Sequence, residues 1–284
     1  MKRRAFMSLL MLLVIGHGIG VAQATELIAS ADQRYDRWLQ AFDYEAYQDD
    51  LECAIDLYEQ ALVTLPQGDT KARFALLVRL SRAYFELAEG YFADYGDAEE
   101  LYSHGKDYAL MALRLDPEFA SIEKTGFRAA LSSAADVEAI FWYGNTLGRF
   151  LEFHRFTAMR GGVRDVHACF ERAVELDSTY MEGGPLRSLA SFYAQVPGFL
   201  GGDMSRAETL FQQALAVGPT FLENRVNWAE FVLKPRRDWP ILCDAVSIVT
   251  AQAEDLTTMS TWPLYNRLAL QRAQALQEET GCEP

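Results

Sequence analysis

The histidines, cysteines and nucleophilic residues of this 284-residue sequence do not form a recognisable catalytic pattern. His104, His154 and His167 are not spaced four apart, and none belongs to an H-E-x-x-H motif. Residues 25–284 contain no G-x-S-x-G elbow, no Walker loop and no dinucleotide fingerprint. We therefore predict a protein that is not an enzyme and that has no cofactor and no metal site.

Residues 142–149 have a composition that a packed helix does not require. Gly144 and Gly148 open one helix face to close approach by a helix or a ligand, and each costs about 1 kcal/mol of helix propensity relative to Ala. Residues 145–164 contain four arginines and a single acid. Tight packing with solvated arginines explains this segment, and so does a pocket wall with a cation for an anionic group. The candidate binding residues are Trp142, Tyr143, Gly144, Asn145 and Arg149.

Residues 183–203 form the second unusual segment. Pro197 and Gly198 should end a short helix, and Gly201 and Gly202 suit a turn with positive φ. Asp203 should then cap a helix over Met204–Val217. This account is complete in structural terms, but the glycines could equally let the backbone approach a ligand or partner. The candidate binding residues here are Arg187, Tyr193, Pro197, Phe199, Gly201, Gly202 and Asp203.

Arg187 is expected either to pair with a carboxylate such as Asp203 or to bind an anionic group of a solute or partner. We further expect the segments 142–149 and 197–203 to approach one another around an internal cavity, because their glycines are costly unless backbones come close.

The four cysteines match no zinc pattern. Cys243 lies near the start of one predicted helix and Cys282 just beyond the end of the next. If these helices pack antiparallel, the two cysteines become neighbours, so we predict a disulfide between them. For Cys53 and Cys169, buried unpaired thiols remain an alternative to pairing.

A repeated helical signature indicates the elements that carry these residues. Small and apolar positions recur at fixed offsets before a helix end, as in the second helix of a tetratricopeptide repeat. The four copies are Ala54, Tyr58, Ala61, Leu62 and Pro66; Gly105, Ala109, Ala112, Leu113 and Pro117; Val166, Phe170, Ala173, Val174 and Ser178; and Ala207, Phe211, Ala214, Leu215 and Pro219.

The spacing of these copies is irregular, at 51, 61 and 41 residues between helix ends, whereas the standard repeat has 34. We expect a long helix over Lys71–Phe92, two helices in the insert Glu118–Arg164, and closing helices near Phe221–Leu233, Trp239–Ala253 and Trp262–Glu278. No sustained strand pattern occurs. The predicted fold is all-α, an irregular tetratricopeptide-like helical superhelix of about 11–13 helices in one domain.

The N-terminal residues predict export. Lys2, Arg3 and Arg4 precede an apolar stretch, and Ala22-Gln23-Ala24 resembles a signal peptidase site. We expect residues 1–24 to be a cleaved signal peptide and 25–284 to be one periplasmic domain. Removal of the three basic residues changes the net charge from −14 to −17, which opposes binding to nucleic acid.

In four motifs the sequence resembles the TRAP-transporter T-component family: W-Y-G-N-x-x-G-R at 142–149, G-x-P-x-R-x-x-x-x-x-Y-A at 183–194, P-G-F-L-G-G-D at 197–203 and A-x-x-x-F-x-x-A-L at 207–215. The resemblance covers roughly residues 50–255. It implies a periplasmic all-α protein with an internal pore or cavity, association with the solute-binding subunit of a TRAP transporter, and a homotrimer. Members are often lipoproteins, whereas this chain has no lipobox cysteine at the predicted cleavage site.

Two functions fit these observations. The first is an accessory component of a TRAP solute-uptake system that docks the solute-binding subunit and passes a small organic or apolar ligand through its cavity. The alternative is a periplasmic tetratricopeptide scaffold that binds protein segments and no small molecule.

Overall fold

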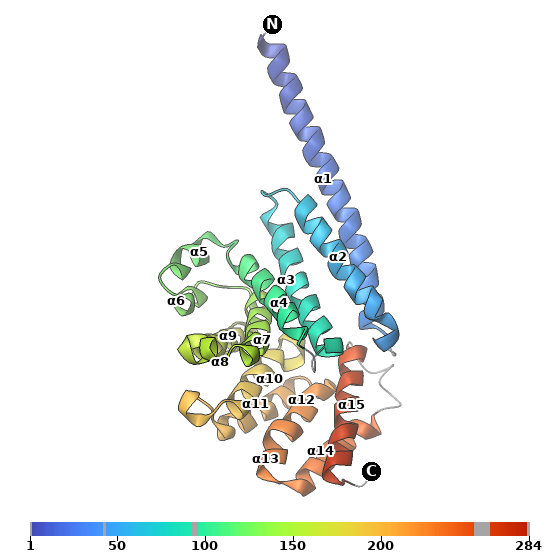
Figure 1. Ribbon diagram of the computed structural model, residues 1–284, viewed down its shortest axis with the longest axis vertical. Coiled ribbons are helices and arrows are strands. Elements are labelled where there is room, and N and C mark those ends of the chain that lie inside the picture. The colour runs from blue at the N-terminus through green and yellow to red at the C-terminus, as the bar shows by residue number, and fades with distance from the viewer. Residues whose placement is uncertain (1, 42–43, 93–95, 253–261, 283–284) are drawn as a thin grey trace.

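All regular elements in the described residues are helices (Figure 1). The computed structural model describes residues 2–41, 44–92, 96–252 and 262–282, with side chains described from Gly20 onwards. The all-α prediction is confirmed, and thirteen α-helices in this part of the chain have at least five residues. The α-helices are α1 (Lys2–Leu39), α2 (Gln48–Thr64), α3 (Thr70–Leu87), α4 (Ala98–Leu113), α5 (Pro117–Glu123), α6 (Phe127–Leu131), α7 (Val137–Phe153), α8 (Arg155–Thr157), α9 (Val163–Asp177), α10 (Tyr180–Gln195), α11 (Met204–Val217), α12 (Leu222–Trp228), α13 (Lys234–Arg236), α14 (Trp239–Ala251) and α15 (Pro263–Thr280).

Five short turns of other helix types connect or extend these helices. Three of them are π-helical turns, which interrupt or prolong an α-helix by one widened turn. The 3₁₀ turns are η1 (Tyr44–Tyr47) and η4 (Gly198–Leu200), and the π turns are η2 (Ala88–Phe92), η3 (Ala158–Gly162) and η5 (Ala229–Leu233).

The four helices with the repeated signature each pack against the long helix that precedes them. The pairs are α1 with α2, α3 with α4, α7 with α9, and α10 with α11. Signature positions such as Tyr58, Phe170 and Phe211 are buried at these contacts. Gly105 shows why small residues recur in the signature, because a Cβ at this position would lie 3.1 Å from the Ser81 carbonyl oxygen of α3 and 2.8 Å from Thr146 Cγ2 of α7.

The insert between Glu118 and Arg164 contains more elements than the two helices expected. It begins inside α5 and includes α6, α7, α8 and the π turn η3. Asp136 starts α7 by accepting a hydrogen bond from the backbone N–H of Ala139. Gly161 adopts φ of +146°, which a helix cannot continue through, and η3 therefore bends the chain into α9.

The helix expected over Lys71–Phe92 is present as α3 continued by η2. The closing helices also lie where they were expected, as α12 with η5, as α14 and as α15. Ala253, the expected end of the middle one, lies outside the described residues. A separate apolar core joins these closing helices through Leu222, Val246 and Leu270.

The C-terminal helix α15 returns to the N-terminal half of the molecule (Figure 1). Tyr265 at its start donates a hydrogen bond to Glu86 of α3, 179 residues earlier in the chain. The helix α15 also contacts α1. The first and last helices of the described chain thus meet beside α3, and this junction contains the candidate site.

The predicted signal peptide falls within α1, whose N-terminal part extends beyond the other helices (Figure 1). The side chains of Lys2, Arg3 and Arg4 lie outside the described ones. Ala24, at the predicted cleavage site, is buried, and the remainder of α1 packs on α2. No helix within the described ranges is both long and apolar enough to cross a membrane. Cleavage after residue 24 stays a prediction.

Candidate functional site

A pocket of about 380 Å³ lies where α15 meets α1, α3 and η2. One part of its wall is apolar and includes Trp38 from α1, Phe85 from α3 and Leu268 from α15. The other part has four charged residues, which are Glu86, Glu89, Glu223 and Arg272. We call the first three the wall glutamates.

Glu86 is the most deeply buried of the wall glutamates, with 3% of its side chain exposed. It accepts hydrogen bonds from Arg82 Nε at 2.8 Å, from the Tyr35 hydroxyl of α1 and from the Tyr265 hydroxyl of α15. A buried carboxylate is tolerable only with such donors, because an unpaired charge would lose its solvation. Glu86 therefore links three helices by one carboxylate.

Arg82 stands behind Glu86 and is enclosed by aromatic rings. Its guanidinium carbon lies 5.5 Å from the ring centroids of Tyr35 and Trp142 and 5.1 Å from that of Trp262. Burial opposes the positive charge, but Glu86, Tyr35 and Tyr265 together outweigh it and hold the pKa of Arg82 above its usual value. Arg82 Nη2 has no hydrogen-bond partner among the described residues.

Glu89 is presented to the pocket by the π turn η2. Its Oε1 atom accepts hydrogen bonds from Arg149 Nε of α7 and from the Tyr102 hydroxyl of α4, both at 2.6 Å. Arg149 also binds Glu152 one turn further along α7.

Glu223 belongs to α12 and is paired with Arg187 of α10, with 3.5 Å between Oε2 and Nε. Arg187 is buried, donates a hydrogen bond from Nη1 to Asn224 Oδ1 at 2.8 Å, and lies 4.5 Å from the centroid of the Phe221 ring. Burial lowers the pKa of Arg187, although Glu223 acts in the opposite direction. Each wall glutamate thus has one arginine behind it, and we call Arg82, Arg149 and Arg187 the backing arginines.

Arg187 is paired with a carboxylate, one of the two alternatives, but this carboxylate is not Asp203, which is engaged elsewhere. Its carboxylate accepts hydrogen bonds from the backbone N–H groups of Ser205 and Arg206 and so caps α11, as the sequence predicts. Glu223 takes its place as the carboxylate beside Arg187.

Asn224 is a site residue that sequence reasoning did not identify. Its Nδ2 group donates to the backbone carbonyls of Glu182, Ala214 and Gly218. The first of these belongs to a left-handed turn in which Met181 and Glu182 have φ of 45° and 55°. Such a backbone is costly for residues other than glycine, and Asn224 stabilises it.

The aromatic and glycine segment of α7 lies in the core and does not line the pocket. Trp142 donates a hydrogen bond to the Tyr180 hydroxyl, and Tyr143 packs on Phe127. A Cβ on Gly144 would lie 2.8 Å from the ring of Phe170 in α9, so this glycine admits a neighbouring helix. Asn145 donates to the Phe141 carbonyl and accepts from Ser188 of α10.

The loop that contains Pro197 and Asp203 is a turn at the surface. Gly201 has φ of +108°, as expected, and a Cβ on Gly202 would collide with the Val196 carbonyl oxygen. Phe199 is 83% exposed. Before the loop, the Tyr193 hydroxyl bonds to His167 and accepts from Arg206.

The expected cavity between these two segments does not coincide with either pocket that we describe. The second pocket, of about 290 Å³, lies near Phe74, Leu113 and Phe119. Neither lining includes a residue of 142–149 or 197–203. The Phe170 ring occupies the space beside Gly144. Of the sequence candidates, Arg149 and Arg187 contact the wall glutamates Glu89 and Glu223. Trp142 is one step further away, because it contacts Arg82, which in turn bonds to Glu86.

One sequence signal could have identified Glu86. Arg82 and Glu86 are four residues apart and interrupt the apolar stripe of α3, between the buried residues Leu80 and Leu87. A charged pair on a core-facing stripe predicts a buried ion pair. No comparable signal marks Glu89 or Glu223.

The three histidines with described side chains contact carboxylates and aromatic rings. His154 lies 2.9 Å from Glu99, and the His104 ring stacks on Tyr84. Within the described ranges no group of three or more His, Cys, Asp or Glu side chains could hold a metal ion.

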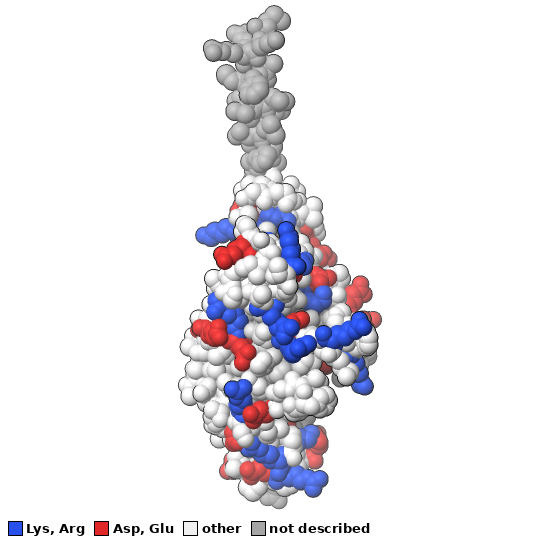
Figure 2. Space-filling view, turned by 90° about the vertical axis from the view of Figure 1, so that its left-hand side faces the viewer, with Lys and Arg blue, Asp and Glu red and all other residues white. Residues whose placement is uncertain are grey.

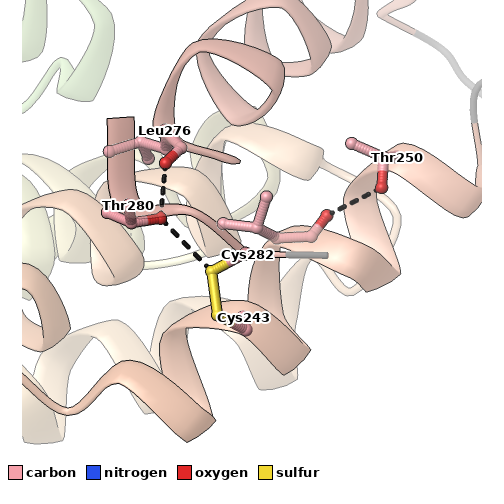
Figure 3. Close-up of a disulfide and its surroundings, with 6 residues drawn as sticks. Cys243, Thr250, Leu276, Thr280 and Cys282 are labelled. Atoms are coloured by element: carbon pink, nitrogen blue, oxygen red, sulfur yellow. Dashed lines mark hydrogen bonds between the residues drawn. A yellow bond between two sulfur atoms is a disulfide. The ribbon is translucent and has the colours of Figure 1, made fainter. Parts of the chain in front are cut away.

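Cys243 and Cys282 form a disulfide that joins the start of α14 to the chain just after α15 (Figure 3). Their Cα atoms are 5.3 Å apart, within the ordinary range. Gly281 with φ of +70° ends α15 and turns the chain toward Cys243. Cys169 is buried and unpaired, and burial raises the pKa of its thiol; Cys53 is unpaired and half-buried.

An apolar and basic surface lies on α8, η3 and the first turn of α9. Phe156 and Met159 are 69% and 68% exposed. Arg155 and Arg164 form no ion pair with a described residue, and the Arg160 guanidinium lies over the Phe156 ring at 4.4 Å. We call these five residues the α8 patch. Figure 2 shows the side of the molecule on which α8 lies in Figure 1, where wide areas without charged side chains separate the charged ones.

The chain is similar to a known family and to a curated protein. A family model described as TRAP transporter T-component matches residues 81–281. A curated relative from Treponema pallidum (strain Nichols), described as an uncharacterized protein, is 31% identical over 129 residues. That alignment spans 42% of this chain and 39% of the relative. The family match includes the wall glutamates and backing arginines, whereas Tyr35 and Trp38 lie before it.

Proposed function

Because the chain belongs to the TRAP transporter T-component family, we propose that it docks the periplasmic solute-binding subunit of a TRAP transporter and passes a ligand through an internal pocket. The family match carries this proposal, since a family of transporter accessory components implies association with other transporter subunits. The pocket at α15 supplies a site of ligand size.

The α8 patch supports the docking step. Two large apolar side chains are exposed together with three arginines, in a chain whose net charge is −14. Aromatic residues, Met and Arg are the residues enriched at the cores of protein interfaces. The complementary partner is therefore a protein surface with an apolar centre and an acidic rim, and we assign this surface to the solute-binding subunit.

Co-purification of this protein with the solute-binding subunit of the same organism's TRAP transporter tests the proposal. We expect a complex, and we expect Phe156→Ser with Met159→Ser to weaken it by about 2 kcal/mol or more, as for buried interface anchors. Isothermal titration calorimetry measures the affinity, and thermal unfolding checks that the variant stays folded.

Val63→Ser is the matched control, because Val63 is an apolar side chain of α2 that is 87% exposed. It should leave the complex unchanged. Absence of any complex with the solute-binding subunit would contradict the proposal. Capture of unfolded protein segments by a protein that binds no small molecule would instead favour the scaffold function.

A further inference from the structure

The first pocket has walls of opposite character, and this restricts the ligand that it can hold. At about 380 Å³, its volume lies within the range of small-molecule sites, which is roughly 300–1,000 Å³. Three carboxylates and one guanidinium contribute to its lining, and the rest of the wall is mainly apolar or aromatic. The ligand should therefore combine one polar end with an apolar body.

The positions of the charged residues around the pocket indicate the charge of the ligand's polar end. The wall glutamates line the pocket, whereas none of the three backing arginines belongs to the lining. Each carboxylate thus faces the pocket with its arginine on another side. Arg272, the single cation of the wall, is paired with Glu230 and lies 3.9 Å from Glu223. A positively charged ligand group would therefore lie next to the wall glutamates and be attracted by them, whereas a ligand carboxylate would be repelled.

Two of the wall glutamates retain capacity to accept hydrogen bonds. Both described hydrogen bonds to Glu89 use Oε1, and its Oε2 has none from a described residue. Glu223 is held by ion pairs of 3.5 and 3.9 Å and by no described hydrogen bond. An ammonium group has several N–H donors and could satisfy both carboxylates.

The aromatic wall also suits a cation. Trp38, Phe85 and Tyr265 line the pocket, and the faces of such rings attract ammonium groups. The Trp38 indole N–H is already engaged, because it donates to the Tyr91 hydroxyl at 2.8 Å. The Trp38 ring is thereby held in place beside Glu86 and Glu89.

We infer that this pocket binds a small organic ammonium compound, with its cation between Glu89 and Glu223 and its apolar body against Trp38, Phe85 and Leu268. Insofar as that compound is a transported solute, the inference rests on the function proposed above. Binding itself depends only on the pocket.

Titration calorimetry with three probes of similar shape tests the inference. The probes are 2-phenylethylammonium, 2-phenylethanol and 3-phenylpropionate, which differ in the charge of the polar end. We expect the ammonium to bind at least about tenfold more tightly than the alcohol, and the carboxylate more weakly than both. Equal binding of ammonium and alcohol, tighter binding of the carboxylate, or no binding of any probe up to about 10 mM would overturn the inference.

Variants locate the site. Glu89→Gln and Glu223→Gln should each weaken ammonium binding about three- to tenfold, with little effect on the alcohol, because each removes one charge and keeps the shape. Glu100→Gln is the control, since Glu100 lies on α4 with 83% of its side chain exposed. Leu268→Trp should fill the pocket and abolish binding of the ammonium and alcohol. Ammonium binding that survives Leu268→Trp in a folded protein would place the ligand elsewhere and overturn the assignment.

The same variants separate this inference from the proposed function. Co-purification with the solute-binding subunit depends on the α8 patch, and we expect it to persist in Leu268→Trp. A protein that binds the ammonium but forms no complex would retain the pocket assignment and lose the transporter role. A protein that forms the complex but binds no probe would retain the transporter role and lose the pocket assignment.

Discussion

Arg187 shows how one buried side chain supports both the pocket and the backbone. Its guanidinium holds Glu223 at the pocket wall and donates to Asn224, which in turn bonds to three backbone carbonyls. Only 5% of Arg187 is exposed, so water cannot replace these contacts. The arginine is therefore part of the folded framework, and its effect on a ligand would act through Glu223.

We predict that Arg187→Ala lowers the free energy of unfolding by about 3–5 kcal/mol, because it leaves Glu223 without its buried partner. Urea denaturation followed by circular dichroism measures this change. The double variant Arg187→Met with Glu223→Leu should recover part of the loss, since apolar side chains of similar volume need no partner. Unchanged stability of Arg187→Ala, together with loss of ligand or partner binding, would instead assign Arg187 a direct binding role.

At the scale of elements, α15 both completes the apolar core of the closing helices and forms one wall of the pocket. Leu270 and Leu276 pack on the side of α14 and α12, while Leu268 and Arg272 face the pocket. The disulfide anchors the far end of α15 to α14 (Figure 3), and Tyr265 anchors its first turn to α3. The position of the pocket wall thus depends on contacts at both ends of one helix.

The disulfide should contribute substantially to stability. Cys243 and Cys282 are 39 residues apart in the chain, and closing a loop of this length restricts the unfolded state by about 4 kcal/mol in the chain-entropy model. We predict that Cys243→Ser with Cys282→Ser lowers the unfolding free energy by about 2–4 kcal/mol. In this double variant, hydrogen exchange of backbone amides should be accelerated more in α14 and α15 than in α2 and α4.

Cys53→Ser is the control for this change, because Cys53 is unpaired. Mass mapping under non-reducing conditions should find the peptides of Cys243 and Cys282 linked. Free thiols at both positions in protein purified without a reducing agent would contradict the prediction.

At the scale of the whole molecule, tyrosine hydroxyls compensate for the excess of acids. With 40 acidic and 26 basic residues, the chain has too few cations to pair every carboxylate. Phenolic O–H groups donate hydrogen bonds without adding charge. Within the described part of the chain, six tyrosines donate to Asp or Glu side chains in this way: Tyr35, Tyr58, Tyr84, Tyr102, Tyr108 and Tyr265.

This arrangement predicts loss of stability at alkaline pH. Burial, and then the neighbouring carboxylates, raises the pKa of each of these six tyrosines. Above about pH 10, where tyrosine ionises in the unfolded chain, the folded state holds more protons than the unfolded state. Stability is therefore unaffected by these groups below about pH 10 and falls as the pH rises beyond it.

Melting temperatures between about pH 8 and 12 test this prediction, with phenolate absorbance at 295 nm followed in the same samples. We expect most of the phenolate signal to appear together with unfolding. Tyr58→Phe should flatten the pH dependence, since it removes one shifted group. Full ionisation of the tyrosines in a still-folded protein would contradict the account.

The sequence by itself determined the features that depend on neighbours a few residues apart. Helix periodicity is local, so the extent of α3 and the positions of the closing helices could be predicted. The Asp203 cap and the positive φ of Gly201 follow from residue type at a turn, and the structure contains both. The signature positions likewise indicated which face of α2, α4, α9 and α11 is buried.

Only the tertiary structure decided which residues form the pocket. Glu86 meets Tyr35 and Tyr265, 51 and 179 residues away, because α1 and α15 both reach α3. The glycine at 144 could have faced a ligand or a helix, and the position of Phe170 decided for the helix. Arg187 found Glu223 rather than Asp203 for the same reason. Helix order and crossing angles set these contacts through side-chain packing over the whole molecule, and no local pattern in the chain encodes them.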